Sequence, residues 1–214
     1  MSEKPYAAIL ETSFRARYEN GQDIWTGEDV MSVAARLLLE TLPAGGGARV
    51  LDIGAGAGRD AELFLAAGHE VVAVDLYAHP VWRGAAARWG GRLRFEQGHF
   101  LEWAKDRGER FDAVLDAGCF HHQLPADYQR YLMAARALLL PGGRAAVCVF
   151  TPNDPEAPSF TKIIDEGRLG RYFSEADLQA ELGLAGFRWE RSRRLRREPC
   201  GLHYLAALIR REEP

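Results

Sequence analysis

The sequence predicts an α/β fold, in which a mostly parallel β-sheet is covered by helices on both faces. The middle of the chain alternates short apolar runs with longer stretches of helix-forming residues, as successive βαβ units do. Such units place their strands in one parallel sheet and their helices on its two faces. The chain has 214 residues, 47% of them hydrophobic and 27% charged, which is enough to bury one sizeable core.

Five apolar runs are the predicted strands of this sheet. They occupy residues 48–53, 70–75, 92–97, 111–116 and 144–150. Helices are predicted between them at residues 59–67, 81–89, 101–107 and 126–140. The sequence LPGGR at 140–144 supplies the proline and glycines that end a helix before the fifth strand.

Two segments flank the core at 46–150, and we expect all three parts to form a single domain over residues 1–214. Residues 1–45 are polar and carry aromatic side chains, and they are expected to form a helical cap or lid. Residues 151–214 begin with a proline-rich connection. A helix that starts at the N-cap Ser174 follows, and then two strand-like runs at 186–195 and 203–211.

Composition and charge exclude several classes of protein. No run approaches the roughly 20 apolar residues of a membrane span, and the first residues lack a signal-peptide pattern, so we expect a cytoplasmic protein with no membrane partner. A formal net charge of −3 argues against general binding of nucleic acid. The three cysteines, Cys119, Cys148 and Cys200, are far apart in sequence, which favours reduced thiols over a disulfide framework.

A glycine-rich stretch follows the first predicted strand, in the sequence RVLDIGAGAGRDAELFLAAGHEVVAVD at 49–75. Gly54, Gly56 and Gly58 form a tight loop at the carboxyl edge of the sheet, where nucleotide-like ligands bind. Arg59 occupies the position of the third glycine of a dinucleotide fingerprint, which disfavours NAD(P). Asp75 ends the second strand, where a carboxylate can accept hydrogen bonds from a ribose diol.

These segments resemble the class I S-adenosylmethionine (SAM) dependent methyltransferases. VLDIGAGAGRD and VVAVD are similar to the first two signature segments of that family, and FDAVLDAGCFHHQLP and LLLPGGRAAVCVF to the segments of its fourth and fifth strands. YENGQDIWTGED at 18–29 resembles the N-terminal segment of the subgroup around thiopurine and tellurite-resistance methyltransferases. The resemblance implies a Rossmann-like sheet of seven strands, of which the last is antiparallel.

The resemblance also implies a cofactor site. Asp52 and the three glycines would surround the methionine part of SAM, Asp75 would bind the ribose hydroxyls, and Trp25 would lie beside the cofactor. His99 stands where the family commonly has an acidic residue, and Ile24 where the subgroup has a proline before the tryptophan. The implied cofactor-binding residues are Trp25, Asp52, Gly54, Gly56, Gly58, Asp75, Leu76, Tyr77, His99, Phe100 and Phe120.

The segment after the fourth strand is expected to lie under the transferred methyl group, with Asp116, Cys119 and His122 as catalytic candidates. His122 could accept a proton from the acceptor, or only shape the pocket. Cys119 is expected to be a small apolar lining residue, and Asp116 could equally be a satisfied polar residue. His121 and His122 are adjacent and expected to project to different sides, so we predict no metal site.

Substrate recognition is expected in the parts that flank the core. The parts concerned are the N-terminal segment with Phe14, Tyr18 and Trp25, the loop after Thr151, and IIDEGRLGRYFS at 163–174. Their aromatic side chains suggest either a lid over a small organic acceptor or a hydrophobic cover for the sheet edge. The arginines between Arg188 and Arg197 could attract an acidic substrate, although such a run is usually a solvated face.

We therefore predict transfer of a methyl group from SAM to an oxygen, sulfur or nitrogen atom of a small molecule, with S-adenosylhomocysteine as the second product. A SAM-binding protein with a non-methylating reaction or with no catalysis is the alternative. A nicotinamide oxidoreductase is the third interpretation. A monomer or homodimer is expected.

Overall fold

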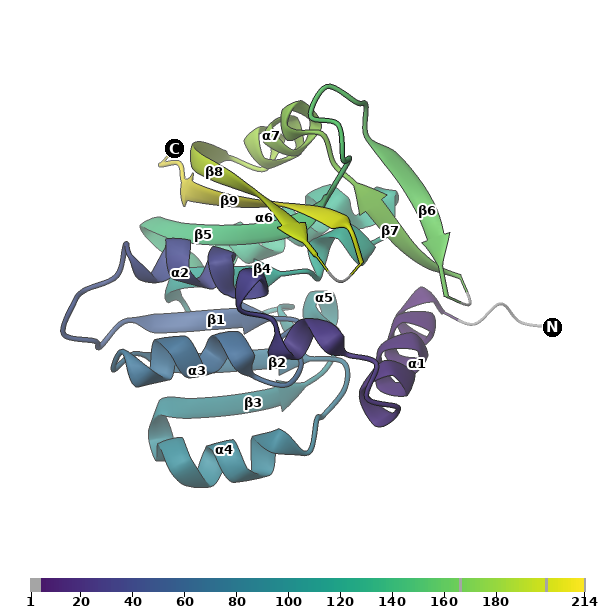
Figure 1. Cartoon of the computed structure of the whole chain (residues 1–214). Coiled ribbons are helices and arrows are strands. Elements are labelled where there is room, and N and C mark those ends of the chain that lie inside the picture. The colour runs from purple at the N-terminus through teal and green to yellow at the C-terminus, as the bar shows by residue number, and fades with distance from the viewer. Residues whose placement is uncertain (1–4, 166, 199, 214) are drawn as a thin grey trace.

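The computed structural model describes residues 5–165, 167–198 and 200–213, and it places one nine-stranded β-sheet at the centre of the molecule (Figure 1). Five strands are mutually parallel and lie in the order β3-β2-β1-β4-β5. They are β1 (Arg49–Ile53), β2 (Glu70–Asp75), β3 (Leu93–Gln97), β4 (Phe111–Ala117) and β5 (Leu139–Thr151). The predicted parallel core is thus confirmed, with β5 starting five residues earlier than expected.

Two antiparallel strands extend this core at β5. The strand β9 (Leu202–Arg211) runs antiparallel to β5, with Val147 opposite Ala207, and β8 (Phe187–Arg197) pairs antiparallel with β9. These seven strands confirm the predicted sheet with its last strand antiparallel.

A second hairpin was not predicted as strands. It consists of β6 (Phe160–Ile164) and β7 (Arg168–Tyr172), and it joins the sheet where Tyr172 lies beside Phe150 of β5. No side chain of β6 is fully buried, so the strand lacks the alternating apolar pattern from which a half-buried strand is predicted. In Figure 1 the hairpin lies beside α1 (Tyr6–Glu19).

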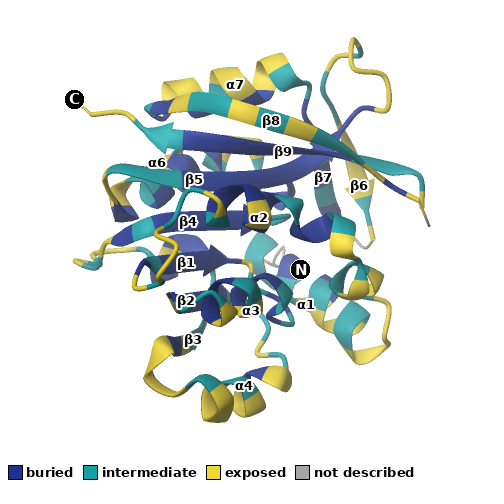
Figure 2. Ribbon diagram, turned by 60° about the vertical axis from the view of Figure 1, so that its left-hand side comes forward, coloured by how far each residue is buried: buried dark blue, intermediate teal, exposed yellow. Residues whose placement is uncertain are grey.

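Helices cover both faces of the sheet. Apolar side chains of α2 (Val33–Leu39), α3 (Arg59–Ala66) and α4 (Val81–Trp89) form one buried cluster with the sheet. Those of α5 (Phe100–Trp103), α6 (Tyr128–Leu138) and α7 (Glu175–Leu184) form a second cluster with its other face. Figure 2 shows buried strands between helices whose outer surfaces are exposed.

Short 3₁₀ helices connect several of these elements. They are η1 (Ile24–Gly27), η2 (Asp29–Ser32), η3 (Gly90–Arg92), η4 (Phe120–His122) and η5 (Pro125–Asp127). Among the described residues, none of the helices combines the length and the apolar character that crossing a membrane requires.

A buried carboxylate holds the loop that follows β4. Asp116 Oδ1 accepts hydrogen bonds from the backbone amides of Cys119 at 2.8 Å and Phe120 at 3.1 Å. Its Oδ2 accepts the hydroxyl of Tyr131 on α6 at 2.5 Å. Burial raises the pKa of Asp116, and these hydrogen bonds oppose that rise by stabilising the carboxylate. Asp116 therefore connects the loop to α6.

We expect Tyr131→Phe to destabilise the protein by about 1–3 kcal/mol, because it removes a donor from a buried carboxylate. The free energy of unfolding is measured by urea titration. Tyr128→Phe is the matched control: Tyr128 lies on the same helix and is also buried, but its hydroxyl has no hydrogen-bond partner among the described residues. That variant should be as stable as the wild type. Equal losses in both variants would contradict the assigned role of Asp116.

Candidate functional site

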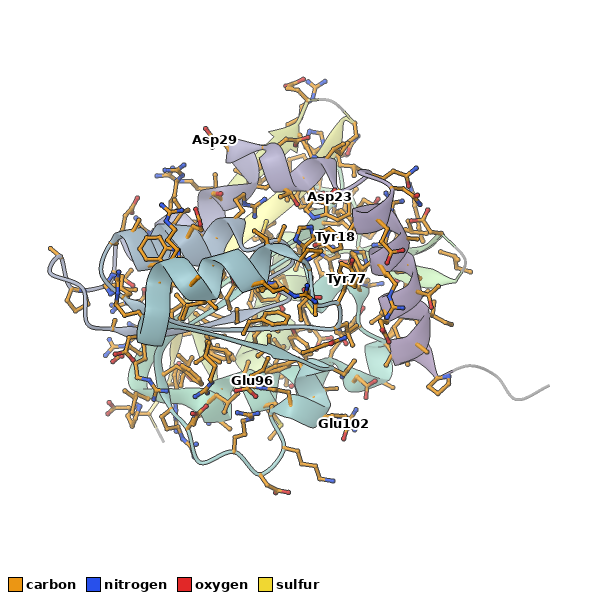
Figure 3. The ribbon with its side chains drawn as sticks, turned by 90° about the horizontal axis from the view of Figure 1, so that it is seen from below. Tyr18, Asp23, Asp29, Tyr77, Glu96 and Glu102 are labelled. Carbon is orange, nitrogen blue, oxygen red and sulfur yellow. The ribbon has the colours of Figure 1, made fainter. Side chains whose placement is uncertain are left out.

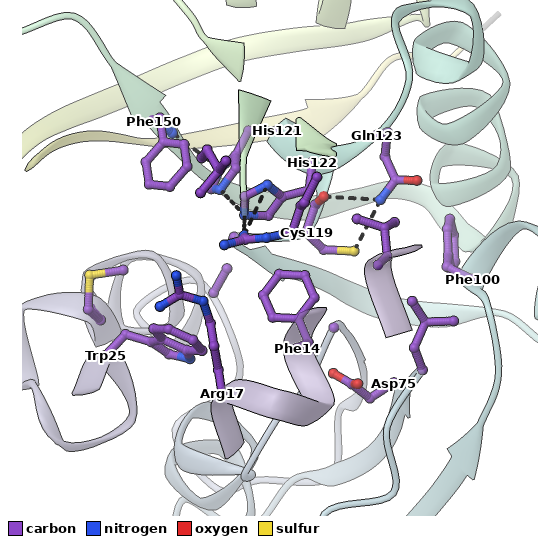
Figure 4. Close-up of a pocket in the computed structure, with 18 of the residues that line it drawn as sticks. Phe14, Arg17, Trp25, Asp75, Phe100, Cys119, His121, His122, Gln123 and Phe150 are labelled. Carbon is purple, nitrogen blue, oxygen red and sulfur yellow. Dashed lines mark hydrogen bonds between the residues drawn. The ribbon is translucent and has the colours of Figure 1, made fainter. Parts of the chain in front are cut away.

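A cavity of about 380 Å³ opens at the carboxyl edge of the parallel sheet (Figure 4). Gly54, Asp75, Gly98, Ala117 and Phe150 line it, and they lie at or just beyond the ends of β1, β2, β3, β4 and β5. Side chains of α1 and η1 lie over it. The remaining lining residues are Leu10, Phe14, Arg17, Tyr18, Trp25, Met31, Val74, Leu76, His99, Phe100, Gly118, Cys119, His121, His122, Gln123, Ile164, Arg168, Tyr172, Arg197, Leu202 and Tyr204.

The loop between β1 and α3 requires its glycines. Gly54 and Gly56 have φ angles of +71° and +53°, which disfavour any residue with a side chain. A Cβ atom at Gly54 would lie 2.8 Å from the Cβ of Cys119, and one at Gly56 would collide with the hydroxyl of Tyr18. Without side chains, the backbone is exposed to the cavity at Gly54 and to a smaller neighbouring hollow at Gly56, as close approach to a ligand requires.

Asp75 joins this loop to the end of β2. Its Oδ2 accepts the Gly56 amide at 2.8 Å, and its Oδ1 accepts the Tyr77 amide at 2.8 Å. Burial raises the pKa of Asp75, and the two amides oppose this effect. The residue also lines the cavity, and each carboxylate oxygen can accept a further hydrogen bond.

The helix α1 is attached over the cavity at both of its ends. The hydroxyl of Tyr6 donates to the carbonyl oxygen of His122 at 2.7 Å and accepts the Leu169 amide at 2.9 Å. Near the other end, Tyr18 stacks on Tyr77 with ring centroids 5.6 Å apart (Figure 3). The helix therefore connects the hairpin β6–β7 to the segment after β2.

Arg59 has a structural task at the position where a dinucleotide loop would have glycine. It pairs with Asp60, and its Nη1 donates to the carbonyl oxygen of Trp25 at 2.7 Å. It thus holds η1, which carries Trp25, against the glycine loop. A second hollow of about 40 Å³ lies here, lined by Asp52, Gly56 and Asp60 among others. Burial raises the pKa of Asp52 well above its ordinary value.

The expectation that His121 and His122 project to different sides was wrong. Their Nε2 atoms lie 3.0 Å apart. Both residues are in the 3₁₀ helix η4, where neighbouring side chains diverge by about 120° and not by the 180° of a strand. Among the described residues no cluster of three or more histidine, cysteine or acidic side chains has the arrangement of a metal site.

Both ring nitrogens of His122 are occupied. Its Nδ1 lies 2.6 Å from the carbonyl oxygen of Leu169 and so carries the proton, which leaves Nε2 as an acceptor. Arg168 Nη1 lies 2.9 Å from that Nε2, and His121 Nε2 also contacts it. Burial, aided by the Arg168 charge, lowers the pKa of His122 to about 3. The geometry favours the pocket-shaping interpretation of His122 over that of a base.

Cys119 lines the cavity as a neutral thiol. Burial and the nearby Asp116 carboxylate raise its pKa well above the ordinary value of a cysteine. The backbone of Cys119 is fixed by Asp116 on one side and by Gln123 Nε2, which donates to its carbonyl oxygen at 3.1 Å, on the other.

Six residues singled out from the sequence do not line the cavity, and two of them, Asp52 and Gly56, line the smaller second hollow. Phe120 is fully buried and stacks on Phe173 with centroids 5.4 Å apart, and Asp116 faces α6 and its own loop. Gly58 lies at the start of α3 beside the ring of Trp82, and Tyr77 packs on Tyr18. The residues Trp25, Gly54, Asp75, Leu76, His99 and Phe100, which were predicted to bind the cofactor, do line the cavity, as do the catalytic candidates Cys119 and His122.

The side of the cavity that lies across Phe14 from Asp75 was largely missed from the sequence (Figure 4). Phe150, Tyr172 and Tyr204 form an aromatic wall there, with centroids of adjacent rings 5.0 and 5.1 Å apart. Arg17 and Arg168 also line the cavity. The segment at 163–174 was singled out, but nothing in it marked Arg168 or Tyr172 individually. In the view of Figure 4, Asp75 lies on one side of Phe14 and Phe150 on the other.

Most arginines of the run between Arg188 and Arg197 are exposed along β8, as expected of a solvated face: Arg188, Arg191, Arg193 and Arg196 are exposed, Arg194 is half-buried and Arg197 is buried. Arg197 is buried in an ion pair with Glu28, and Arg191 pairs with Glu40 at 2.7 Å. These pairs fasten β8 to the N-terminal segment. Arg188 is exposed as expected, with 60% of its side-chain surface accessible.

Comparison with known proteins agrees with this geometry. Residues 27–191 match the family described as methyltransferase domain. The crystal structure of the Burkholderia thailandensis 1,6-didemethyltoxoflavin-N1-methyltransferase, with bound 1,6-didemethyltoxoflavin and S-adenosylhomocysteine, is 40% identical to this chain. The two superpose with a TM-score of 0.89 over 99% of this chain and 94% of that one.

Two ubiquinone biosynthesis O-methyltransferases also match. That of Azorhizobium caulinodans is 31% identical over 155 residues, and that of Cereibacter sphaeroides is 36% identical over 113 residues. The matches cover 66% and 52% of this chain but only 59% and 44% of those proteins. The family match and the nearly full-length structural match together show that the chain belongs to the SAM-dependent methyltransferases.

Proposed function

We propose that the protein transfers the methyl group of SAM to a ring nitrogen, or to a conjugated oxygen, of a small planar acceptor. The observation that carries this proposal is one continuous cavity with two different ends. One end has the bare glycine loop and Asp75, and the other has the aromatic wall of Phe150, Tyr172 and Tyr204. Stacking against aromatic rings suits a flat conjugated molecule. The bound ligand of the Burkholderia thailandensis N1-methyltransferase supports a nitrogen acceptor.

The cofactor end fits SAM. We propose that the backbone around Gly54 and Gly56 faces the methionine part, that Asp75 accepts the ribose hydroxyls, and that Leu76, His99 and Phe100 lie beside the adenine. Trp25, held by Arg59, would cover the cofactor. When bound there, SAM would supply a methyl group attached to a positively charged sulfur. A well-aligned lone pair of the acceptor would displace that sulfur from the methyl carbon.

The acceptor must supply that lone pair without help from a protein base. His122 has no free nitrogen, and Cys119 is a neutral thiol with no role as nucleophile. The catalysis therefore depends on alignment of the two reactants. Holding them in near-attack geometry can lower the activation free energy by roughly 7–11 kcal/mol. A ring nitrogen or an already ionised oxygen meets this requirement, whereas an aliphatic hydroxyl does not.

In this proposal the three chain segments have different roles in binding the cofactor and the acceptor. The core at 46–150 would hold the cofactor, and the segments 1–45 and 151–214 would form most of the acceptor end. The predictions of a cytoplasmic location, of a monomer or homodimer and of no nucleic-acid partner rest on the sequence alone and stay predictions.

We expect S-adenosylhomocysteine to bind at least tenfold more tightly than NADPH in isothermal titration calorimetry. Asp75→Ala should weaken this binding by about a hundredfold, because it removes a charged acceptor for two hydroxyls, each worth roughly 1.5 kcal/mol or more. The control is Asp29→Ala, which removes a carboxylate that is fully exposed on η2 and should leave the affinity unchanged. Tighter binding of NADPH than of S-adenosylhomocysteine would refute the cofactor assignment.

We expect kcat to be independent of pH between about 6.5 and 8.5 with a non-ionisable ring-nitrogen acceptor. The acceptor is found by screening heterocycles, phenols, thiols and amines for methyl transfer. Because the pKa of His122 is lowered to about 3, it stays neutral throughout this range and gains a proton only at far lower pH. A fall in kcat below about pH 6.5, centred on the ordinary histidine pKa, would show that a histidine acts as the base.

A further inference from the structure

The acceptor end of the cavity carries two guanidinium groups that share one carboxylate. Asp165 Oδ2 accepts Nε of Arg17 at 2.8 Å and Nη2 of Arg168 at 3.0 Å. Both arginines line the cavity, and Asp165 is partly exposed. The cluster therefore has one positive charge in excess.

No other described residue that lines this end supplies the missing negative charge. Arg197 is already neutralised by its buried ion pair with Glu28. The remaining lining carboxylate, that of Asp75, lies at the cofactor end, where it is bonded to the glycine loop. An uncompensated cation inside a cavity with low-dielectric walls attracts an anionic ligand more strongly than one at the surface does.

Arg168 is better placed than Arg17 to bind an anionic ligand in the cavity. It is 5% exposed, its Nη1 is held by His122, and its guanidinium carbon lies 4.6 Å from the ring centroid of Phe14. Its Nε–H is buried and has no hydrogen-bond partner in the part of the chain that the structure describes. A buried donor without a partner is costly, and it leaves the Arg168 guanidinium short of one acceptor.

We propose that the acceptor binds as an anion, with its negative charge delocalised over a planar ring system, and that Arg168 and Arg17 recognise this charge. The acceptor class is then a conjugated heterocyclic or aromatic acid with an ionised N–H or O–H group. This inference rests on the proposed function and specifies its substrate. His122 is a positioning residue, because it acts through Arg168.

The charge balance of the reaction agrees with this form of the acceptor. A bond forms between the acceptor nitrogen or oxygen and the methyl carbon, and the bond from that carbon to sulfur breaks with its electron pair left on sulfur. The anion and the positive sulfur both become neutral, so no proton is left to remove. An anionic acceptor thus explains why the described residues of the acceptor end include an excess cation and a histidine, His122, that has no free ring nitrogen.

The test measures binding of matched acid and neutral probes in the presence of saturating S-adenosylhomocysteine. Lumazine is compared with its N1,N3-dimethyl derivative, and para-nitrophenol with para-nitroanisole, by calorimetry above the pKa of each free acid. The wild type should bind the ionised member of at least one pair about ten- to a hundredfold more tightly, the range of a charged hydrogen bond. Arg168→Gln should remove this preference without changing the affinity for S-adenosylhomocysteine.

Three further variants separate a charge effect from a structural one. Arg168→Lys should keep part of the preference, because it retains the charge but not the planar fork. Asp165→Asn should strengthen anion binding, because it raises the excess charge of the cluster, whereas a merely structural role for Asp165 predicts weaker binding. Arg188→Gln, which removes an exposed arginine of β8, should have no effect.

Equal or tighter binding of the neutral probes by the wild type, or no binding of any acid, would overturn the inference. Methyl transfer that proceeds without a preference for anions would leave the proposed function in place while refuting the anionic acceptor. Failure to bind S-adenosylhomocysteine would refute the proposed function, and the preference between acid and neutral probes could still be measured without it.

Discussion

The hydrogen bond from the Gly56 amide to the Asp75 carboxylate is the contact on which the candidate site depends. It joins the ends of β1 and β2 and holds the glycine loop in a conformation that leaves its backbone bare. Cys119 and Tyr18 approach the loop so closely that a side chain at Gly54 or Gly56 has no room. The same carboxylate lines the cavity, so the structure of the sheet edge and the candidate ribose site are built from one group.

The acceptor end depends on a different set of contacts, made between segments that are far apart in sequence. Tyr6 joins α1 to η4 and β7, Arg17 joins it to Asp165, and Arg197 joins β8 to Glu28 near η1. These polar contacts surround an aromatic wall. None of these contacts belongs to the parallel core, so the proposed acceptor end is built from loops and additions on a rigid scaffold, where binding residues are commonly found.

The chemistry of the site follows from which groups burial leaves available. Burial keeps His121, His122 and Cys119 neutral, and their hydrogen bonds occupy the nitrogens that a proton would need. Arg168 is buried too, yet Asp165 compensates only part of the charge that it shares with Arg17. Among the described residues, the cavity thus offers alignment and one positive charge in excess, which suits the proposed reaction of an anion with a cation.

The sequence by itself determined the parallel core, the glycine loop and Asp75, because strand–loop–helix periodicity and glycine spacing are local properties of the chain. It also marked Trp25, His122 and the segment 163–174 as parts of the site. Only the tertiary structure decided that His122 has no free nitrogen, that Phe120 and Asp116 face the interior, and that Arg17 and Arg168 share Asp165. The reason is physical: charge excess and free lone pairs depend on partners contributed by α1, η4 and β7, which no spacing within one segment encodes.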